Sequence, residues 1–327
     1  MAVIDVHTHM LSLQWIELLR ASGGRYTVKK NAAREECIYV EDAQFMTLFP
    51  GMWDYDLRIG KMDEAGVDMA IVSLTCPNVY WGDSATSLRA AQLVNDSMAE
   101  QQRARSSRIA WMASLPWQYP DVAKQELARA VAAGAVGVMV LANIGGRNLT
   151  DPLFAPVWQE IDRLALPVLV HPTMVQGMEA MDLGELALAG VVGFTWDTTL
   201  AFTRMIFSGF LDQYTKLRLI ASHGGGTLPY VAGRLDRCFE KIPACSAKIK
   251  EKPSTYLQRI YYDTVLYDVG ALGLCLSAAG SADNLLFGSD YPHNIGDMSG
   301  CLARVRTLPE GQVRLITHKN AERIFKL

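Results

Sequence analysis

The sequence predicts an α/β fold, a (β/α)8 barrel of the TIM type with an insertion after the first strand. Eight short apolar runs alternate along the 327 residues with longer amphipathic stretches, which is the order that eight βα units give. Most of these runs are apolar throughout, as is typical of parallel strands covered by helices. A doubly wound open sheet is the alternative, but the Gly-rich phosphate loop that often follows its first strand is missing here.

The predicted strands and helices follow one another in a regular order, and we expect residues 1–327 to form a single domain. Glycine after a helix, and proline or asparagine before a strand, mark the joints. The predicted strands cover 3–9, 69–75, 109–115, 136–141, 167–171, 217–223, 259–264 and 284–290. Further helices end the chain after those predicted over 57–65, 84–103, 121–133, 152–164, 183–213, 228–241 and 269–279.

The segment 11–55 interrupts this repeat directly after the first strand. It contains a charged stretch over 29–36 and bulky apolar residues over 45–53. Loops that follow the strands of a barrel lie over the end where active sites are found. We therefore expect either a lid or wall of a substrate pocket, or a surface excursion that packs on the barrel or mediates oligomer contacts.

Composition and charge narrow the class of function. Half of the residues are hydrophobic (50%) and 20% are charged, which allows an ordinary buried core. A net charge of -3 does not favour nucleic acid or an anionic membrane as a partner. The apolar runs are too short to cross a bilayer, and we expect no secretory signal before the first strand. The six scattered cysteines are typical of reduced thiols, so we expect a cytoplasmic protein.

The first predicted strand ends in Asp5-Val-His7-Thr-His9. Side chains at positions i and i+2 of a strand project to the same face, so both imidazoles can reach one metal ion. Neutral imidazole nitrogens suit zinc and similar divalent metals. The spacing therefore indicates half of a metal site.

Three later strands also end in residues that bind metals or move protons, namely His171, His223 and Asp290. Each histidine alone is more typical of a hydrogen-bonded core or loop residue than of a metal ligand, and Asp290 alone could begin a turn. The C-terminal ends of all strands in a barrel meet at one rim, so together these residues predict one metal site. His293 follows closely and is expected to line the mouth, whereas His318 is expected to be structural.

Four motifs carry a resemblance to a known family: the histidine pair, His171-Pro172, Ser222-His223-Gly224-Gly225-Gly226 and Gly288-Ser289-Asp290-Tyr291-Pro292. In this order they resemble the amidohydrolase superfamily, and more closely its aminocarboxymuconate semialdehyde decarboxylase branch. The resemblance extends over nearly the whole chain and includes 53–54, 62–68, 153–172, 223–236, 262–264 and 320–325.

The resemblance implies a set of metal ligands and an unliganded catalytic histidine. His223 would be the catalytic histidine, and the ligands would be His7, His9, His171 and Asp290. Superfamily members with two metals carry a carbamylated lysine at the end of the fourth strand, and the run 136–143 has no lysine. We therefore expect one divalent metal, with zinc the first candidate and manganese the second.

The resemblance also implies a metal-dependent decarboxylase, a carbon–carbon lyase that releases CO2 without an oxidant. Its substrate would be a hydroxylated aromatic, heteroaromatic or muconate-type acid, in the catabolism of aromatic compounds. The required proton comes either from metal-bound water with His223 as acid and base, or from Asp290. A metal-dependent hydrolase or hydratase of a lactone, amide or C–C bond is the alternative, because a metal beside a histidine also activates water. A barrel that binds ligand without turnover is the third hypothesis.

One departure from the family bears on the substrate. Members that act on aminocarboxymuconate semialdehyde carry an arginine several residues before the Trp-Asp pair, and here the run 45–50 contains none. Losing one of two carboxylate clamps favours a less charged substrate, such as a hydroxylated aromatic acid. A set of bulky side chains is expected either to wall an aromatic pocket or to serve in packing: Met46, Phe49, Trp53, Trp81 and Trp196.

The second carboxylate-binding arginine of the family corresponds to Arg234 and is supplied by a neighbouring subunit. Its presence implies a homodimer or a larger homo-oligomer, for which the helical region 183–213 is the candidate interface. Two further residues have open roles. Asp263, at the end of the seventh strand, orients His223 or caps a turn, and Arg204 forms an ion pair within a helix or a dimer contact.

Overall fold

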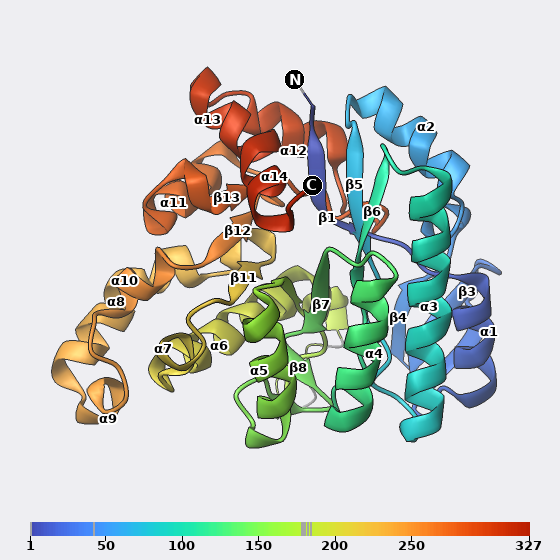
Figure 1. Cartoon of the computed structure of the whole chain (residues 1–327), viewed down its shortest axis with the longest axis horizontal. Helices are drawn as coiled ribbons and strands as arrows, with labels where there is room; N and C mark the ends of the chain where they lie inside the picture. Colours follow the sequence, from blue (N-terminus) through green and yellow to red (C-terminus); the bar gives the residue numbers. More distant parts are fainter. Residues whose placement is uncertain (1, 42, 178–180, 182, 184) are drawn as a thin grey trace.

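Eight parallel strands follow one another in chain order around the centre of the molecule in the computed structural model (Figure 1). The structure describes residues 1–327 except 1, 42, 178–180, 182 and 184. The strands are β1 Ile4–His9, β5 Met69–Ser73, β6 Ile109–Ala113, β7 Gly137–Leu141, β10 Pro167–His171, β11 Arg218–Ala221, β12 Tyr261–Asp263 and β13 Leu285–Leu286.

The last strand returns to the first and nearly closes the sheet. The backbone N–H of Val6 donates to the carbonyl oxygen of Phe287 at 2.9 Å, and Thr8 forms a parallel bridge with Tyr291. The sheet is therefore a nearly closed barrel of the TIM type. This confirms the predicted fold class and excludes the open doubly wound sheet.

Helices surround the barrel, and several begin where a polar residue satisfies their free N–H groups. The side chain of Asp54 accepts from two N–H groups of α2, and Asp83 and Asp268 cap α3 and α11 in the same way. The helices between successive strands are α2 Tyr55–Ala65, α3 Ser84–Ala104, α4 Pro120–Ala132, α5 Ala155–Leu164, α6 Phe194–Phe207, α8 Leu228–Lys241 and α11 Val269–Ala279. Shorter helices are α7 Phe210–Gln213, α9 Pro243–Ser246, α10 Pro253–Leu257, α12 Met298–Val305, α13 Glu310–Arg314 and α14 Asn320–Phe325.

The helix predicted over 183–213 is shorter and broken, so that prediction was wrong in extent. Residues 182 and 184 lie outside the described chain, and a 3-10 turn at Glu185–Ala187 and a π turn at Ala189–Gly193 precede α6. Gly209 separates α6 from α7. Its φ of 77° is left-handed, a conformation that interrupts a helix and that glycine adopts more readily than other residues. The strand predicted over 284–290 is also short, since only β13 is regular.

Two apolar layers hold the barrel together. The inner layer fills the barrel with side chains from all eight strands, such as Ile4, Met112 and Leu169. Tyr261 of β12 is only partly buried there, and α14 adds Ile324 and Phe325. Figure 1 shows α14 beside β1, so the C-terminal helix packs near the first strand. The outer layer lies between the strands and the helices. A packed interior leaves the C-terminal ends of the strands as the place for a site.

The segment between β1 and α2 forms a small structure of its own. It consists of α1 Leu13–Ser22, an antiparallel sheet of β2 Tyr26–Lys30, β3 Glu36–Val40 and β4 Ala43–Thr47, and a 3-10 turn at Pro50–Met52. Trp15 and Leu19 of α1 are buried in the outer layer. A short hairpin, β8 Asn143–Ile144 with β9 Arg147–Asn148, follows β7.

Candidate metal centre

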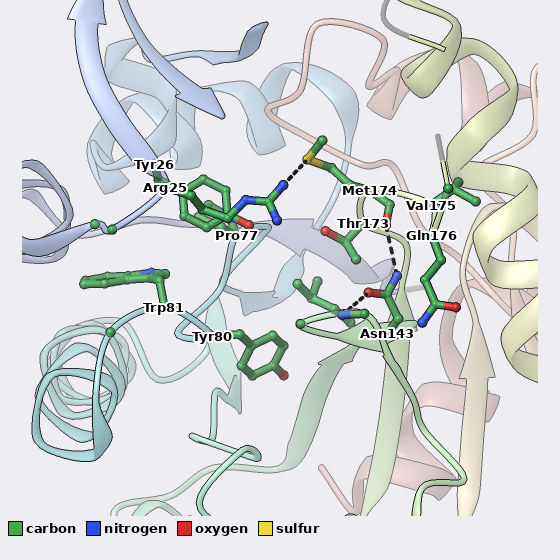
Figure 2. Close-up of a pocket in the computed structure, with 17 residues that line it drawn as sticks. Arg25, Tyr26, Pro77, Tyr80, Trp81, Asn143, Thr173, Met174, Val175 and Gln176 are labelled. Atoms are coloured by element: carbon green, nitrogen blue, oxygen red, sulfur yellow. Dashed lines mark hydrogen bonds between the residues drawn. The ribbon is translucent and has the colours of Figure 1, made fainter. Parts of the chain in front are cut away.

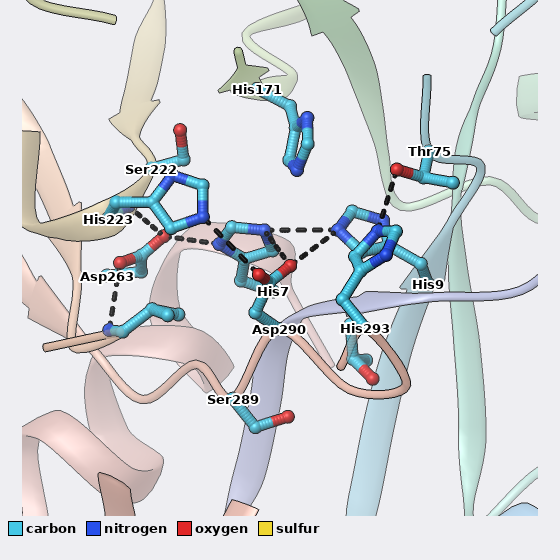
Figure 3. Close-up of polar contacts among 12 residues, drawn as sticks. His7, His9, Thr75, His171, Ser222, His223, Asp263, Ser289, Asp290 and His293 are labelled. Atoms are coloured by element: carbon cyan, nitrogen blue, oxygen red, sulfur yellow. Dashed lines mark hydrogen bonds and ion pairs between the residues drawn. The ribbon is translucent and has the colours of Figure 1, made fainter. Parts of the chain in front are cut away.

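The strand ends bring three histidines and one aspartate to a single point at the mouth of the barrel (Figure 3). His7 and His9 come from β1, His171 is the last residue of β10, and Asp290 follows β13. All four are buried, and their ligand atoms lie within 4.8 Å of one another. The chain thus assembles, from three separate strands, the group that the sequence predicted as metal ligands.

The nitrogens of the histidine pair face the carboxylate of Asp290. Nε2 of His7 lies 3.1 Å from Nε2 of His9, and Oδ1 of Asp290 lies 3.3 Å and 3.2 Å from these two atoms. Asp290 adopts the left-handed conformation, with φ of 59°, which few residues other than glycine favour. Such backbone strain is typical of functional sites.

Hydrogen bonds from outside the cluster turn each ring so that its Nε2 faces inward. Nδ1 of His7 is 2.5 Å from Oδ2 of Asp263, and Nδ1 of His9 is 3.2 Å from the hydroxyl of Ser73. Nδ1 of His171 donates to the carbonyl oxygen of Pro172 at 2.8 Å. Partners of this kind fix the tautomer of metal-binding histidines in known metal sites.

The cluster fits a divalent metal. Nε2 of His171 is buried and has no hydrogen-bond partner in the described part of the chain. Such an unpartnered buried atom costs about 1–3 kcal/mol, and a cation at the shared point would satisfy it. Three imidazoles and one carboxylate are a donor set that divalent transition metals prefer.

Burial and neighbouring charges shift the pKa of every member of the cluster. Burial alone lowers the pKa of His7, but Asp263 and Asp290 outweigh burial and raise that pKa to about 10. Burial lowers the pKa of His9 to about 3. The pKa of Asp290 is held well below its usual range, because the surrounding histidines outweigh burial. The carboxylate is therefore ionised at neutral pH and suits a cation.

His223 lies beside the cluster but is not one of its four converging residues. Its Nε2 is 3.5 Å from Oδ2 of Asp290, and its buried Nδ1 has no partner among the described residues. A tight turn holds it there: Gly226 has φ of 64°, and a Cβ at this position would lie 2.1 Å from the carbonyl oxygen of Thr195. The glycines after His223 thus serve the turn, and they leave one imidazole face near Asp290.

Asp263 has a role that the sequence left open between two alternatives. Its carboxylate accepts from the backbone N–H groups of His223 and Gly224, each at 3.0 Å, so it caps the turn. The ring that it orients is that of His7, which sequence reasoning missed. Gly288 permits this contact, because a Cβ there would lie 2.8 Å from Cβ of His7 and 3.1 Å from that of Asp263. Gly288 of the Gly-Ser-Asp motif was the sequence feature that could have indicated this close approach of His7 and Asp263.

A cavity of about 370 Å³ opens onto the cluster. Met46, from β4, and His293 line it together with His171, His223 and Asp290. Nε2 of His293 is 2.9 Å from the hydroxyl of Thr75, a partner that the sequence did not indicate. The remaining wall is largely apolar or neutral: Gln44, Phe45, Thr47, Met52, Cys76, Ala187, Gly190, Phe194, Asn294 and Ile295.

The other residues predicted for the pocket lie elsewhere. Phe49 and Trp53 pack against the outer layer, and Trp196 is 45% exposed on α6. Arg234 is exposed on α8 and has no hydrogen-bond or ion-pair partner within the described chain. His318 lies 3.9 Å from Glu322 of the C-terminal helix, away from the mouth.

Figure 2 shows a second cavity, of about 470 Å³. Trp81 lines this second cavity, as do Arg25, Tyr26, Tyr80 and Gln176. No histidine of the cluster lines it. Cys76 lines the first cavity and Pro77 the second, so this part of the chain separates the two.

Three histidines and an aspartate that converge at the mouth of a barrel are typical of metal-dependent barrel enzymes. The chain belongs to the amidohydrolase family: the family model described as Amidohydrolase matches residues 4–327. No helix in the described part of the chain is long and apolar enough to cross a membrane.

Characterised relatives of this chain are decarboxylases, and the resemblance seen in the motifs is confirmed. The 2-amino-3-carboxymuconate-6-semialdehyde decarboxylase of Dictyostelium discoideum is 29% identical over 301 residues, 90% of this chain and 83% of that protein. The gamma-resorcylate decarboxylase of Rhizobium radiobacter is 30% identical over 285 residues, 83% of this chain and 87% of that protein.

A solved structure confirms the fold over the whole chain. The dihydroxybenzoic acid decarboxylase of Polaromonas sp. JS666, with bound manganese and the inhibitor 2-nitroresorcinol, aligns with a TM-score of 0.79 at 24% identity. The alignment covers 100% of this chain and 97% of that chain.

Proposed function

We propose that this protein is a metal-dependent, non-oxidative decarboxylase of a hydroxylated aromatic or heteroaromatic acid with a single carboxylate. The observation that carries the proposal is the inward-facing cluster of His7, His9, His171 and Asp290, of which His171 and Asp290 line the 370 Å³ cavity. The decarboxylases among its relatives support the reaction type.

The four clustered residues would hold one divalent metal. Zinc is our first candidate because its catalytic sites are built from imidazole and carboxylate ligands. Manganese, present in the Polaromonas relative, is the second. When bound, the metal supplies a Lewis acid that polarises the carboxylate of the substrate and an oxygen ortho to it. We propose one metal and not two, because β7, residues Gly137–Leu141, contains no lysine that could bridge a second metal.

His223 and Asp290 would move the proton. Oδ1 of Asp290 faces the histidine pair, whereas Oδ2 faces Nε2 of His223 at 3.5 Å, so the two groups can share one proton beside the cavity. The proton is delivered to the ring carbon that bears the carboxylate. The C–COO bond then breaks, its electron pair restores the aromatic ring, and CO2 leaves.

The charge of the cavity favours one carboxylate on the substrate. No lysine or arginine lines it among the described residues, and Met46 lies where relatives in the resembled branch place an arginine. The chain that forms the cavity thus offers a second carboxylate no cation in return for its lost hydration, and the partner's Arg234 would have to supply one. His293 would form a hydrogen bond with a ring hydroxyl of the substrate. Its Nε2 is already hydrogen-bonded to Thr75, so Nδ1 remains for the ligand.

We further propose a homodimer in the cytoplasm and a single folded domain. Large apolar side chains near the start of α6 and on α8 are exposed, among them Leu186 at 84% and Tyr230 at 82%. Arg234 lies one turn beyond Tyr230 and would reach the cavity of the partner. The cysteines are free, as in a reducing compartment. Light scattering after size exclusion tests the dimer, and a monomer would refute it.

The reaction is tested by incubating the metal-loaded enzyme with a panel of hydroxybenzoic and hydroxypicolinic acids. We expect release of one CO2 for each acid consumed and formation of the corresponding phenol. Hydroxyisophthalic acids, which keep a hydroxyl ortho to a carboxylate, serve as dicarboxylate controls and should react poorly. Hydrolysis of lactones or amides without any CO2 from the acids would refute the proposal in favour of a hydrolase.

A further inference from the structure

Arg58 is a buried cation that the proposed chemistry does not use. It lies on α2 with no exposed surface, and no carboxylate of the described residues lies within ion-pair distance of its guanidinium. Burying a guanidinium is costly unless hydrogen bonds compensate for its lost hydration. The contacts that Arg58 makes therefore indicate what it does.

All of these contacts are made at the end of β1 or in the segment after β13, the two parts of the chain that hold His9 and Asp290. Nη1 of Arg58 donates to the hydroxyl of Thr8 at 2.7 Å, and Nη2 donates to the carbonyl oxygen of His9 at 2.5 Å. Nε lies 2.9 Å from the sulfur of Met10. The guanidinium carbon also lies 4.7 Å from the ring centre of Tyr291, the neighbour of Asp290.

Near the metal ligands, the regular pairing of β1 with its two neighbouring strands is limited. The register of β1 against β5 shifts between Asp5 and Thr8, and β13 has only two residues. Beyond it, the carbonyl oxygen of Tyr291 accepts from the N–H of His9 at 2.7 Å and from the hydroxyl of Thr8 at 2.9 Å. Arg58 binds that same hydroxyl and stacks on that same residue.

We propose that Arg58 is a positioning residue that sets the separation between His9 and Asp290, and so prepares the ligand cluster for its metal. The planar guanidinium donates to three consecutive residues and covers an aromatic ring at once, which a lysine cannot do. This inference rests on the metal site of the proposed function. It goes beyond that function because Arg58 does not line the cavity and contacts the cluster only through the backbone carbonyl oxygen of His9.

The test compares metal binding by purified full-length protein with Arg58→Lys, Arg58→Met and the milder Thr8→Val. Zinc affinity is measured by competition with a chelating dye, and the absorption bands of the cobalt-loaded protein report ligand geometry. Arg58→Lys should weaken zinc binding by about 10-fold or more, as loss of an outer partner does, with altered cobalt bands. Thr8→Val should weaken it less, in the same direction.

Met62→Ala is the matched control, because Met62 is equally buried on α2 and belongs to the outer apolar layer. It should lower the melting temperature of the metal-free protein and leave zinc affinity unchanged. Arg58→Lys and Thr8→Val with wild-type zinc affinity and cobalt bands would overturn the role of Arg58. Wild-type protein that binds no metal would instead overturn the metal site itself, so the two failures are distinct.

Discussion

His171 and His223 are neighbouring histidines whose removal should have opposite effects on metal content. Their ring centres are 5.7 Å apart, and both side chains are largely buried. Nε2 of His171 faces the cluster. Among the described residues, the imidazole of His223 has one hydrogen-bond partner, Oδ2 of Asp290, at the long distance of 3.5 Å. We therefore predict that His223→Ala keeps its metal and that His171→Ala loses it.

The His223→Ala substitution should affect turnover far more than stability. Nδ1 of His223 has no partner among the described residues and its Nε2 contact is long, so His223→Ala breaks no strong hydrogen bond there and should barely change the melting temperature. The loss of a general acid should lower kcat by about 10²–10⁴-fold, which corresponds to about 3–5 kcal/mol in the barrier.

The assay pairs metal content by mass spectrometry with CO2 release under saturating substrate. His171→Ala should lose both metal and activity at equal protein concentration. If His223→Ala lost its metal, His223 would be a ligand and the assigned roles would be wrong. If it kept both metal and turnover, the proton would come from elsewhere.

Three further substitutions test the pocket wall, the partner of His7 and a buried carboxylate on α6. Met46→Arg should raise kcat/KM for a ring dicarboxylate relative to its monoacid by about 10-fold, the worth of one charge-assisted pair, and an unchanged ratio counts against our view of the wall. Asp263→Asn removes the carboxylate 2.5 Å from Nδ1 of His7 and should weaken metal binding by about 10–100-fold in dye competition. Burial raises the pKa of Asp197 from 3.8 to about 6, so the native state holds a proton that the unfolded chain releases between these values. The free energy of unfolding should fall by up to about 3 kcal/mol as pH rises through that window, and urea titrations should show a flatter dependence for Asp197→Asn.

The barrel and the cluster were predictable because both depend on simple periodicities. Strand residues two apart share a face, which predicted the pairing of His7 with His9. The C-terminal ends of parallel strands share one rim, which predicted that His171 and Asp290 would join them. No contact between specific side chains was needed for either inference.

The pocket wall and the outer partners depend on rotamers and on where helices begin, which the pattern does not give. Because α6 begins only at Phe194, after two irregular turns, Trp196 faces solvent and Phe194 lines the cavity. The contact of Asp263 with His7 crosses β13 and needs the missing Cβ of Gly288. Such contacts join residues far apart in the chain, and hydrophobic periodicity carries no information about them.

The most direct test of the central claim is the dependence of CO2 release on metal. The purified protein is stripped with a chelator, assayed with a monohydroxybenzoic or dihydroxybenzoic acid, and titrated with zinc or manganese. We predict no CO2 release from the stripped protein and full recovery at one metal ion per chain, with His171→Ala unresponsive. CO2 release by the stripped protein, or recovery only at two ions per chain, would contradict the proposed mononuclear decarboxylase.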